Sequence, residues 1–241
     1  MSHKNMADVT GVDDNAVAHA SSIKAIYVYE APVRIWHWIN ALAITVLCIT
    51  GYFIGSPLPS VPGEASNNFL MGYIRFTHFA AGYVFAIGLV GRAYWAIVGN
   101  HHARELFSVP LFTAAYWREL FSMLKWYGFM RPYPNRYVGH NPLARISMFF
   151  GFLLMGVFML CTGFALYGEG AQEGHLTHTL FTSWVLPLFS NSQDLHTWHH
   201  VGMWVIICFV ILHVYAAIRE DIMGRQSIIS TMISGFRMFK N

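Results

Sequence analysis

The chain has 241 residues, of which 55% are hydrophobic and only 11% are charged. Soluble domains carry about a quarter charged residues, so this composition excludes an ordinary soluble protein and indicates an integral membrane protein. The formal net charge of +3 is small, and no nucleic-acid partner is expected. The three cysteines lie in apolar runs without a CxxC or CxxCH motif, which excludes a thiolate iron–sulfur site, covalently attached haem and a disulfide framework.

The first part of the chain contains a polar segment and two apolar stretches. Residues 1–28 lack an apolar core, which predicts a disordered cytoplasmic tail rather than a cleaved signal peptide. The stretches over about 35–54 and 73–98 are each long enough to cross the hydrocarbon core of a bilayer. The connection 55–72 is rich in Pro and Gly and is expected to be an irregular loop.

The segment 103–131 is apolar but interrupted by charged residues. The apolar side chains that recur at helical spacing are Phe112, Tyr116, Leu120, Met123 and Tyr127, and the polar stripe consists of Arg118, Ser122 and Lys125. This pattern favours an amphipathic helix that lies in the membrane interface or extends the second span beyond the bilayer. A fifth span is the alternative.

Two further apolar stretches, over about 146–167 and 197–218, complete the predicted spans. Between them, 168–194 contains acidic residues but no Lys or Arg. Its apolar patch at 184–189 is too short to span a membrane, so it is expected to dock a partner or to lie in the interface. Residues 225–241 are expected to form a cytoplasmic C-terminal tail. The predicted fold class is an all-α integral membrane protein, a bundle of four transmembrane helices within a membrane domain over 29–224.

The basic residues predict the orientation of the bundle. If the N-terminus is cytoplasmic, every Lys and Arg except Arg75 falls in the tails, in the connection between spans two and three, or in the inner half of a span. The positive-inside rule therefore places both termini in the cytoplasm.

Five of the 13 histidines lie inside the predicted spans, and four of them, His37, His78, His199 and His213, fall at two matching depths. His199 and His213 are fourteen residues apart, so on a helix they point along nearly the same face at heights roughly 21 Å apart. His37 lies at the level of His213, near the inner face, and His78 lies at the level of His199, near the outer face. The four form two cross-helix pairs, the arrangement that two bis-histidine haems b require, with the same residues as ligands to iron.

Two other positions share these levels. Gly51, fourteen residues after His37, falls at the outer level, where a missing side chain lets a porphyrin approach the backbone. Arg92, fourteen residues after His78, falls at the inner level, where its guanidinium meets a haem propionate or snorkels to the inner face. The sequence CTGF at 161–164 echoes ITGY at 49–52, although an echo this short also arises by chance.

Simpler interpretations of the histidines are also open. A single intramembrane histidine can hydrogen-bond a neighbouring helix without binding a cofactor. His196 and His200 compete with His199, but on a helix they point roughly 100° and 140° away from His213, against about 40° for His199.

Several segments together resemble one known family. They are EAPV at 30–33, RIWHWI at 34–39 followed by ITG at 49–51, MGYIR at 71–75, GHNP at 139–142 and REDIM at 219–223. The chain from about Tyr29 to Gly235 is similar to the cytochrome b subunit of membrane-bound nickel–iron hydrogenases.

This resemblance implies a di-haem, quinone-reducing subunit of the bacterial inner (cytoplasmic) membrane, with no catalytic nucleophile of its own. In the family the haem ligands fall on His37, His78, His199 and His213. The implied partner is the hydrogenase small subunit, anchored by its own C-terminal helix. The distal iron–sulfur cluster of the small subunit would pass electrons to the outer haem. The hydrogenase large subunit would be bound through the small subunit. The inner haem would reduce membrane quinone.

The resemblance also suggests where quinone binds. Related di-haem subunits of formate dehydrogenase place an asparagine beside the quinone at the start of the third helix, and Asn141 is the nearest equivalent in this chain. His140 and Arg145 are neighbouring candidates. A structural role for Asn141 before Pro142 is the alternative.

Three rival functions remain at this point. The same fold serves other dehydrogenases, such as formate dehydrogenase or thiosulfate reductase. A haem-free membrane anchor would only tether a peripheral enzyme. A histidine-lined transporter would be expected to show carboxylates within its spans, and the predicted spans contain none.

Overall fold

The computed structural model describes residues 25–59, 63–64, 68–171 and 174–239. Most of the tail predicted for residues 1–28 therefore lies outside the described residues. Its last part is ordered into strand β1 (Ile26–Tyr27), which leads directly into the first helix.

Four helical spans long and apolar enough to cross a membrane confirm the predicted number. They are α2 (Ala31–Gly55), α3 (Leu70–Val98), the composite span Pro142–Glu169 and α8 (Ser192–Ile222). The composite span joins α5 (Pro142–Ser147), the π-helix η4 (Met148–Leu154) and α6 (Met155–Glu169). Each span runs beyond the predicted apolar stretch, because helical hydrogen bonding continues into the polar residues that flank a hydrocarbon-crossing segment.

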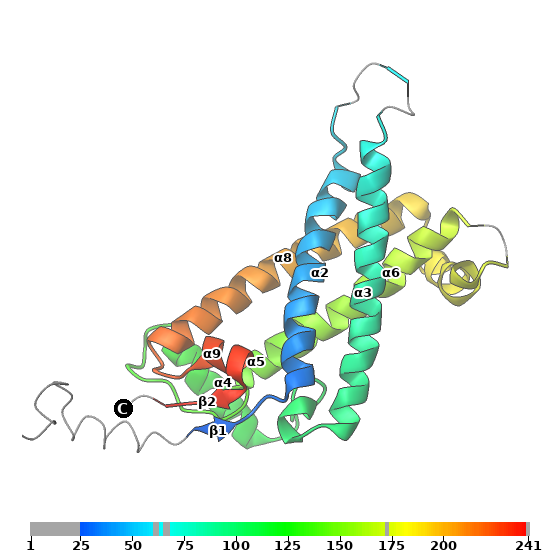
Figure 1. Cartoon of the computed structure of the whole chain (residues 1–241). Helices are drawn as coiled ribbons and strands as arrows, with labels where there is room; N and C mark the ends of the chain where they lie inside the picture. The colour runs from blue at the N-terminus through cyan, green and yellow to red at the C-terminus, as the bar shows by residue number, and fades with distance from the viewer. Residues whose placement is uncertain (1–24, 60–62, 65–67, 172–173, 240–241) are drawn as a thin grey trace, which may run out of the picture.

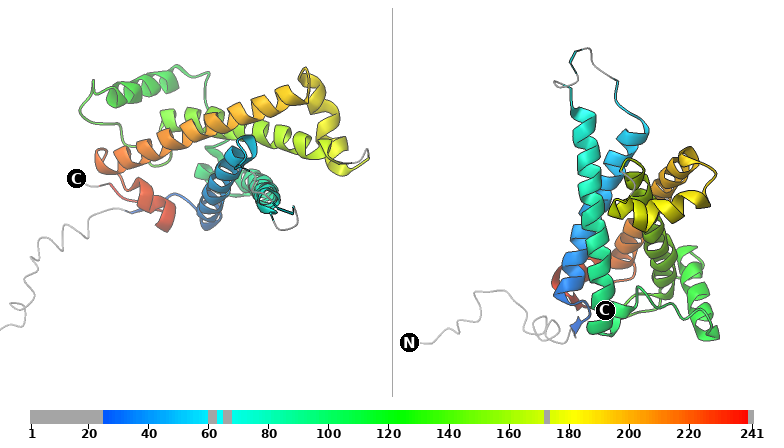
Figure 2. Two further views of the ribbon diagram at one scale, coloured as in Figure 1. Left: turned by 90° about the horizontal axis from the view of Figure 1, so that it is seen from above. Right: turned by 90° about the vertical axis from the view of Figure 1, so that its right-hand side faces the viewer.

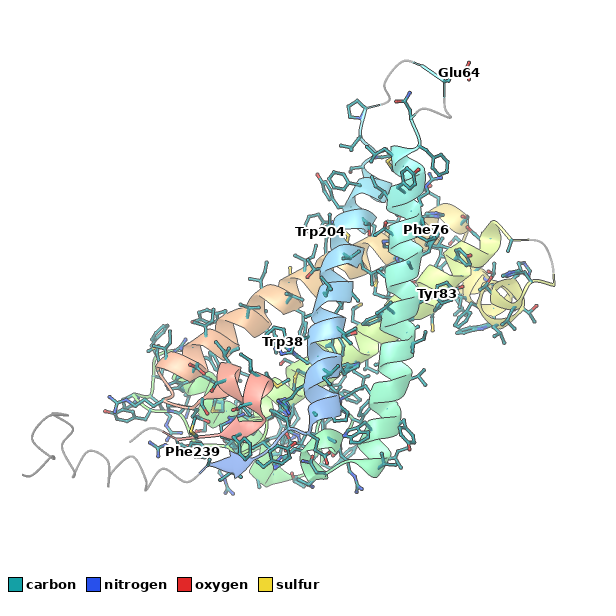
Figure 3. All side chains as sticks on the ribbon, viewed as in Figure 1. Trp38, Glu64, Phe76, Tyr83, Trp204 and Phe239 are labelled. Carbon is teal, nitrogen blue, oxygen red and sulfur yellow. The ribbon has the colours of Figure 1, made fainter. Side chains whose placement is uncertain are left out.

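The spans form two pairs of neighbouring helices. α2 lies beside α3, and α6 lies beside α8, and the two pairs cross obliquely (Figures 1 and 2). Ala43 of α2, Phe85 of α3 and Phe152 of η4 are buried in one cluster between the pairs. Aromatic side chains such as Trp38, Phe76 and Trp204 are exposed on the outside of the spans (Figure 3), as expected for helices that face lipid.

The connection between α3 and α5 contains the predicted amphipathic helix. It is α4 (Ala114–Tyr127), which buries Tyr116, Leu120, Met123 and Trp126 along one face. The alternative that this segment extends the second span is wrong, because α3 ends at Val98 and η3 (His101–Arg104) and a loop separate the two helices. Phe112 precedes α4 and is fully exposed, so the predicted apolar stripe began too early.

The C-terminal segment, predicted only as a tail, folds back onto the start of α2. It forms α9 (Ile228–Ser234) and strand β2 (Phe236–Arg237), which pairs antiparallel with β1. Trp38 donates from Nε1 to the Met232 carbonyl at 3.1 Å, and Arg34 donates to the Ile233 carbonyl. The described parts of both terminal segments therefore meet at one end of the bundle, together with α4 and η3 (Figure 1). We call this the terminal end and the other the loop end.

At the loop end, the segment between α6 and α8 folds into short helical turns. They are η5 (His178–Thr182), α7 (Ser183–Val185) and η6 (Leu186–Leu188). Val185 is buried against Ala165 of α6 and Leu195 of α8, and Thr182 donates from Oγ1 to the Ala165 carbonyl at 2.8 Å. The apolar patch predicted here thus packs on the bundle and does not form a span.

Candidate functional site

Two pairs of histidines lie between the helices, at different heights. His37 of α2 and His213 of α8 lie toward the terminal end, with ring centroids 6.3 Å apart. His78 of α3 and His199 of α8 lie toward the loop end, near enough for their imidazoles to interact electrostatically. All four side chains are half-buried. The structure therefore brings together the two cross-helix pairs that the depth argument predicts.

The His37–His213 spacing suits a shared iron atom. An imidazole nitrogen binds a metal at about 2 Å and lies about 1 Å from its ring centroid, so two trans imidazoles have centroids about 6 Å apart. The described residues hold no group of three or more His, Cys, Asp or Glu side chains placed for a bare metal ion. A pair of imidazoles fits haem iron, because the porphyrin supplies the remaining ligands.

The pair toward the loop end is held by two threonines. The Nδ1 atom of His78 lies 2.8 Å from Thr50 Oγ1 of α2, and the Nδ1 atom of His199 lies 2.7 Å from Thr162 Oγ1 of α6. Gly51 lies beside His78: a Cβ atom there would be 3.3 Å from His78 Cε1. Gly51 was predicted to admit a porphyrin, but the imidazole of His78 lies against the space that its missing side chain leaves.

Several polar atoms of α2 and α3 are buried without partners, and those of Trp36 and Arg92 lie close together. His37 Nδ1, Trp36 Nε1, Asn40 Oδ1 and the Nε and Nη1 atoms of Arg92 are buried without a hydrogen-bond partner among the described residues. Buried polar groups normally have partners, so the unpaired N–H groups of Trp36 and Arg92 indicate that a polar group binds beside them. Haem propionates and ordered water have the acceptor oxygens that the unpaired N–H groups need.

Arg92 is buried within the bundle. It is 4% exposed, donates from Nη2 to the Ala103 carbonyl at 2.6 Å and lies over the Trp36 ring. The alternative that Arg92 snorkels to the surface is wrong, because the η3 segment packs over its guanidinium. Its two unpaired N–H-bearing atoms are available for a propionate.

The competing histidines are bound elsewhere. His196 hydrogen-bonds through Nδ1 with the Ser192 carbonyl at 2.9 Å, within its own helix. The Nε2 atom of His200 accepts from Trp204 Nε1 at 3.2 Å, and the His200 ring packs against Gly55. Both rings thus have other partners, so the geometry favours His199 among the three.

A buried polar network at the terminal end was not predicted from the sequence. Glu105 is 6% exposed and accepts from His102 Nδ1 at 2.8 Å and from His140 Nδ1 at 2.7 Å. Burial acts to raise the pKa of Glu105, but the hydrogen bonds from His140 and His102 outweigh it and lower the pKa to about 2. Glu105 is therefore an ionised acceptor that fixes both imidazoles.

Tyr29 completes this network. Its hydroxyl lies 3.2 Å from the His140 ring nitrogens. Burial, and secondly the Glu105 carboxylate, raise the pKa of Tyr29 above its ordinary value, so the hydroxyl keeps its proton. Since His140 Nδ1 donates to Glu105, its Nε2 is the atom that accepts from Tyr29. His140 also lies near enough to His37 and His213 to interact electrostatically with both.

A pocket of about 210 Å³ opens beside His140. Its walls include Tyr116 of α4, Tyr137 of the following loop and Arg145 of α5. Two of the three residues considered for a quinone, His140 and Arg145, line this pocket.

Asn141 lies behind the pocket and is 4% exposed. Its Oδ1 accepts from the Ala144 backbone N–H at 2.7 Å, which caps α5, and its Nδ2 donates to the Glu220 carboxylate. Both polar groups of its side chain are therefore bound within the protein. This geometry supports the structural role that the sequence left open for Asn141.

Sequence reasoning missed Thr50, Thr162 and Glu105. The repeated Thr-Gly dipeptide was the available signal for Thr50 and Thr162. The sequence does not show that these threonines face histidines, because this depends on α2 lying beside α3 and α6 beside α8. Glu105 lies in a loop, where no periodic pattern marks burial.

Comparisons with known proteins identify the family of this chain. A model of the family described as prokaryotic cytochrome b561 matches residues 28–235. The probable Ni/Fe-hydrogenase B-type cytochrome subunit of Cupriavidus necator is 67% identical over 241 residues, which cover 100% of this chain and 98% of the relative. The corresponding subunit of Azotobacter chroococcum mcd 1 is 61% identical over 217 residues, covering 90% of each chain.

A more distant relative extends the comparison. The probable Ni/Fe-hydrogenase 1 B-type cytochrome subunit of Escherichia coli (strain K12) is 50% identical over 233 residues, which cover 94% of each chain. A B-type cytochrome carries haem b, which agrees with the histidine pairs and the apolar spans. The chain is thus a multi-pass membrane protein that belongs to the prokaryotic cytochrome b561 family, among relatives named as B-type cytochrome subunits of Ni/Fe-hydrogenases.

Proposed function

We propose that this chain is a di-haem cytochrome b subunit that anchors a nickel–iron hydrogenase to the bacterial inner membrane and relays its electrons to membrane quinone. The observation that carries the proposal is the presence of two cross-helix histidine pairs at separate heights in one bundle. A single histidine pair would hold one haem, which would only stabilise the bundle or store an electron. Two pairs at different heights would hold two haems, which suits electron transfer across the bilayer.

The residues divide into two haem sites. His37 and His213 would ligate the inner haem, with Arg92 bound to a propionate. His78 and His199 would ligate the outer haem, with Gly51 leaving room beside His78. When bound, the two haems supply one-electron carriage between the two membrane faces.

The polar pocket at the terminal end supports quinone binding near the inner site. Arg145 would donate to a quinone oxygen, and His140 would line the pocket beside it. Glu105 and Tyr29 hold the His140 ring in one orientation. Asn141 would then support the pocket from behind through its contacts with α5 and Glu220.

The partner and orientation follow from the relatives and the charges. The relatives are named as hydrogenase subunits, so the small subunit, with its C-terminal helix and distal iron–sulfur cluster, would bind at the outer face and carry the large subunit. The distribution of basic residues supports a cytoplasmic terminal end, and the quinone pocket would then lie at the inner face.

The test is a reduced-minus-oxidised spectrum with pyridine haemochrome quantitation of the purified chain. The protein is reduced once with dithionite and once with hydrogen plus the hydrogenase encoded by the same organism. Two b-type haems per chain, both reducible by hydrogen, are expected.

The other outcomes separate the rivals. Haem that only dithionite reduces would overturn the hydrogenase partner and favour another dehydrogenase. Absence of haem would overturn the relay and favour a haem-free anchor.

A further inference from the structure

Two threonine–glycine dipeptides occupy equivalent places in the two helix pairs. Thr50-Gly51 lies on α2 and faces His78, and Thr162-Gly163 lies on α6 and faces His199. Both threonines are buried. The similarity between the sequences at 49–52 and 161–164 therefore corresponds to a repeated structural arrangement. Chance alone is an insufficient explanation for this similarity.

The hydrogen bonds of the two threonines match atom for atom. Thr50 donates from Oγ1 to the Val46 carbonyl at 2.6 Å, and Thr162 donates from Oγ1 to the Phe158 carbonyl at 2.8 Å. A hydroxyl has one hydrogen, so each threonine has only acceptor lone pairs left for the imidazole 2.7–2.8 Å away. The proton in each contact must then belong to the histidine.

This requirement fixes the tautomer of both imidazoles. A neutral imidazole carries one N–H, so a proton on Nδ1 leaves Nε2 with a free lone pair. Metal-bound histidines usually donate their second ring nitrogen to a partner in this way, which orients the ring and raises its basicity. The threonines thus present Nε2 of both rings in the form that binds iron.

The adjoining glycines bring the helix backbones against the same rings. A Cβ atom on Gly51 would lie 3.3 Å from His78 Cε1, and one on Gly163 would lie 3.1 Å from His199 Cε1. Such contacts are shorter than ordinary van der Waals separations, so a Cβ atom at either position would push the imidazole away from the helix that also carries its threonine.

The other pair lacks this arrangement. His37 Nδ1 is buried without a hydrogen-bond partner among the described residues, and the His213 ring stacks on Phe209 at 5.7 Å between centroids. The two sites therefore differ in how their ligands are held.

We propose that Thr50-Gly51 and Thr162-Gly163 are matched positioning elements that hold His78 and His199 as Nδ1–H tautomers and so preorganise the outer haem site. This inference rests on the proposed function, because it takes the two histidines as haem ligands. It adds that a threonine on a neighbouring helix sets the tautomer of each ligand, and that the outer site alone uses this device.

The experiment replaces Thr50 and Thr162 singly by Val, which keeps the side-chain shape but lacks the hydroxyl, and by Ser, which keeps the hydroxyl. The control is Thr45→Val. Thr45 lies on the same helix and donates to the Ala41 carbonyl at 2.8 Å, but it is exposed and contacts no histidine. Haem content, haem release to apomyoglobin, the two midpoint potentials and the low-spin haem EPR spectrum are measured on each purified full chain.

Each Val variant is expected to bind the outer haem about 10- to 100-fold more weakly, the usual effect of removing a partner of a metal-bound histidine. The midpoint potential of the outer haem should shift upward, since a less basic imidazole stabilises ferric iron less, and its EPR signal should broaden or move. The inner haem should keep its potential. Each Ser variant should restore all three properties, and Thr45→Val should match the wild type.

Two negative outcomes are distinguishable. If His78→Ala and His199→Ala both retain two haems, the ligand assignment in the proposed function fails. If those variants lose the outer haem but Thr50→Val and Thr162→Val keep wild-type affinity, potential and EPR spectrum, the positioning inference fails and the proposed function stands.

Discussion

Asn141 and Glu220 are hydrogen-bonded across 79 residues of sequence, which ties the first turn of the third span to the last turn of the fourth. Glu220 also accepts from the Tyr127 hydroxyl at 2.8 Å, so the end of α4 joins the same contact. Asn141, which the resemblance associates with quinone, thus also connects the ends of α4, α5 and α8.

Replacing Asn141 should therefore lower the stability of the protein rather than act directly on quinone reduction. Asn141→Ala removes the α5 cap and is expected to destabilise the protein by about 1 kcal/mol from the cap, plus a further penalty because the Glu220 carboxylate loses one donor and keeps the Tyr127 hydroxyl. Asn141→Ser keeps a capping oxygen and should lose only the second part. Thermal unfolding in detergent measures both. Full stability of Asn141→Ala together with lost quinone reduction would instead show that the side chain contacts quinone directly.

The inner ligands predict a separation of two activities. His37→Ala or His213→Ala should remove the inner haem and abolish quinone reduction, because each leaves one imidazole without its trans partner. Hydrogen oxidation with an artificial dye should persist in the same complex, since the dye accepts electrons before this subunit. Loss of dye activity in an intact complex would contradict the relay.

Gly51 allows a sharp steric test with a matched control. Gly51→Ala places a methyl group 3.3 Å from His78 Cε1, whereas Gly82→Ala on α3 meets nothing within 4 Å. The first change should lower occupancy of the outer haem and the second should not, as measured by haem per chain. Equal haem content in the two variants would mean that the imidazole moves aside without penalty.

Arg92 predicts an effect confined to the inner site. Arg92→Gln keeps a donor but removes the charge, and Arg92→Met removes both while retaining length. If the guanidinium binds a propionate, the inner haem should dissociate faster in the order wild type, Gln, Met, with the outer haem unchanged. Redox titration of both haems in the same sample checks this. Parallel loss of both haems would indicate a general packing defect.

Glu105 predicts acid sensitivity. Its pKa falls from 4.5 in the unfolded chain to about 2 in the folded protein, so between these values the unfolded state binds more protons. The stabilisation, on the order of 3 kcal/mol, is present above pH 4.5 and is lost as pH falls toward 2. Unfolding followed from pH 7 downward should show this decline in the wild type. Glu105→Gln should be less stable at pH 7 and should lack the decline.

The four spans and the histidine pairs were predictable because both depend on local spacing and depth. A run of apolar residues identifies a span by itself, and His199 and His213 reveal two heights because a helix has a fixed rise. The same reasoning placed Gly51 at the height of His78 and His199, and the structure shows Gly51 beside His78.

The remaining features depend on which helices are neighbours. The contact between Thr162 and His199 requires α6 to lie beside α8, and the burial of Arg92 requires η3 to fold over it. Residues 225–241 read as a tail because their helix and strand are short, and only pairing with Ile26–Tyr27 stabilises the strand. Such long-range contacts leave no periodic signal in the sequence.

The pairing of β1 with β2 has a consequence for biosynthesis. Strand β2 ends at Arg237, so the support that Met232 and Ile233 give to the start of α2 forms only after nearly the whole chain has left the ribosome. His37 lies on that part of α2, so we expect the inner site to depend on these late contacts, while Thr50, between three and four turns further along the helix, lies clear of them. Removing the residues from Gly235 onward should trap a half-assembled cytochrome that carries only its outer haem.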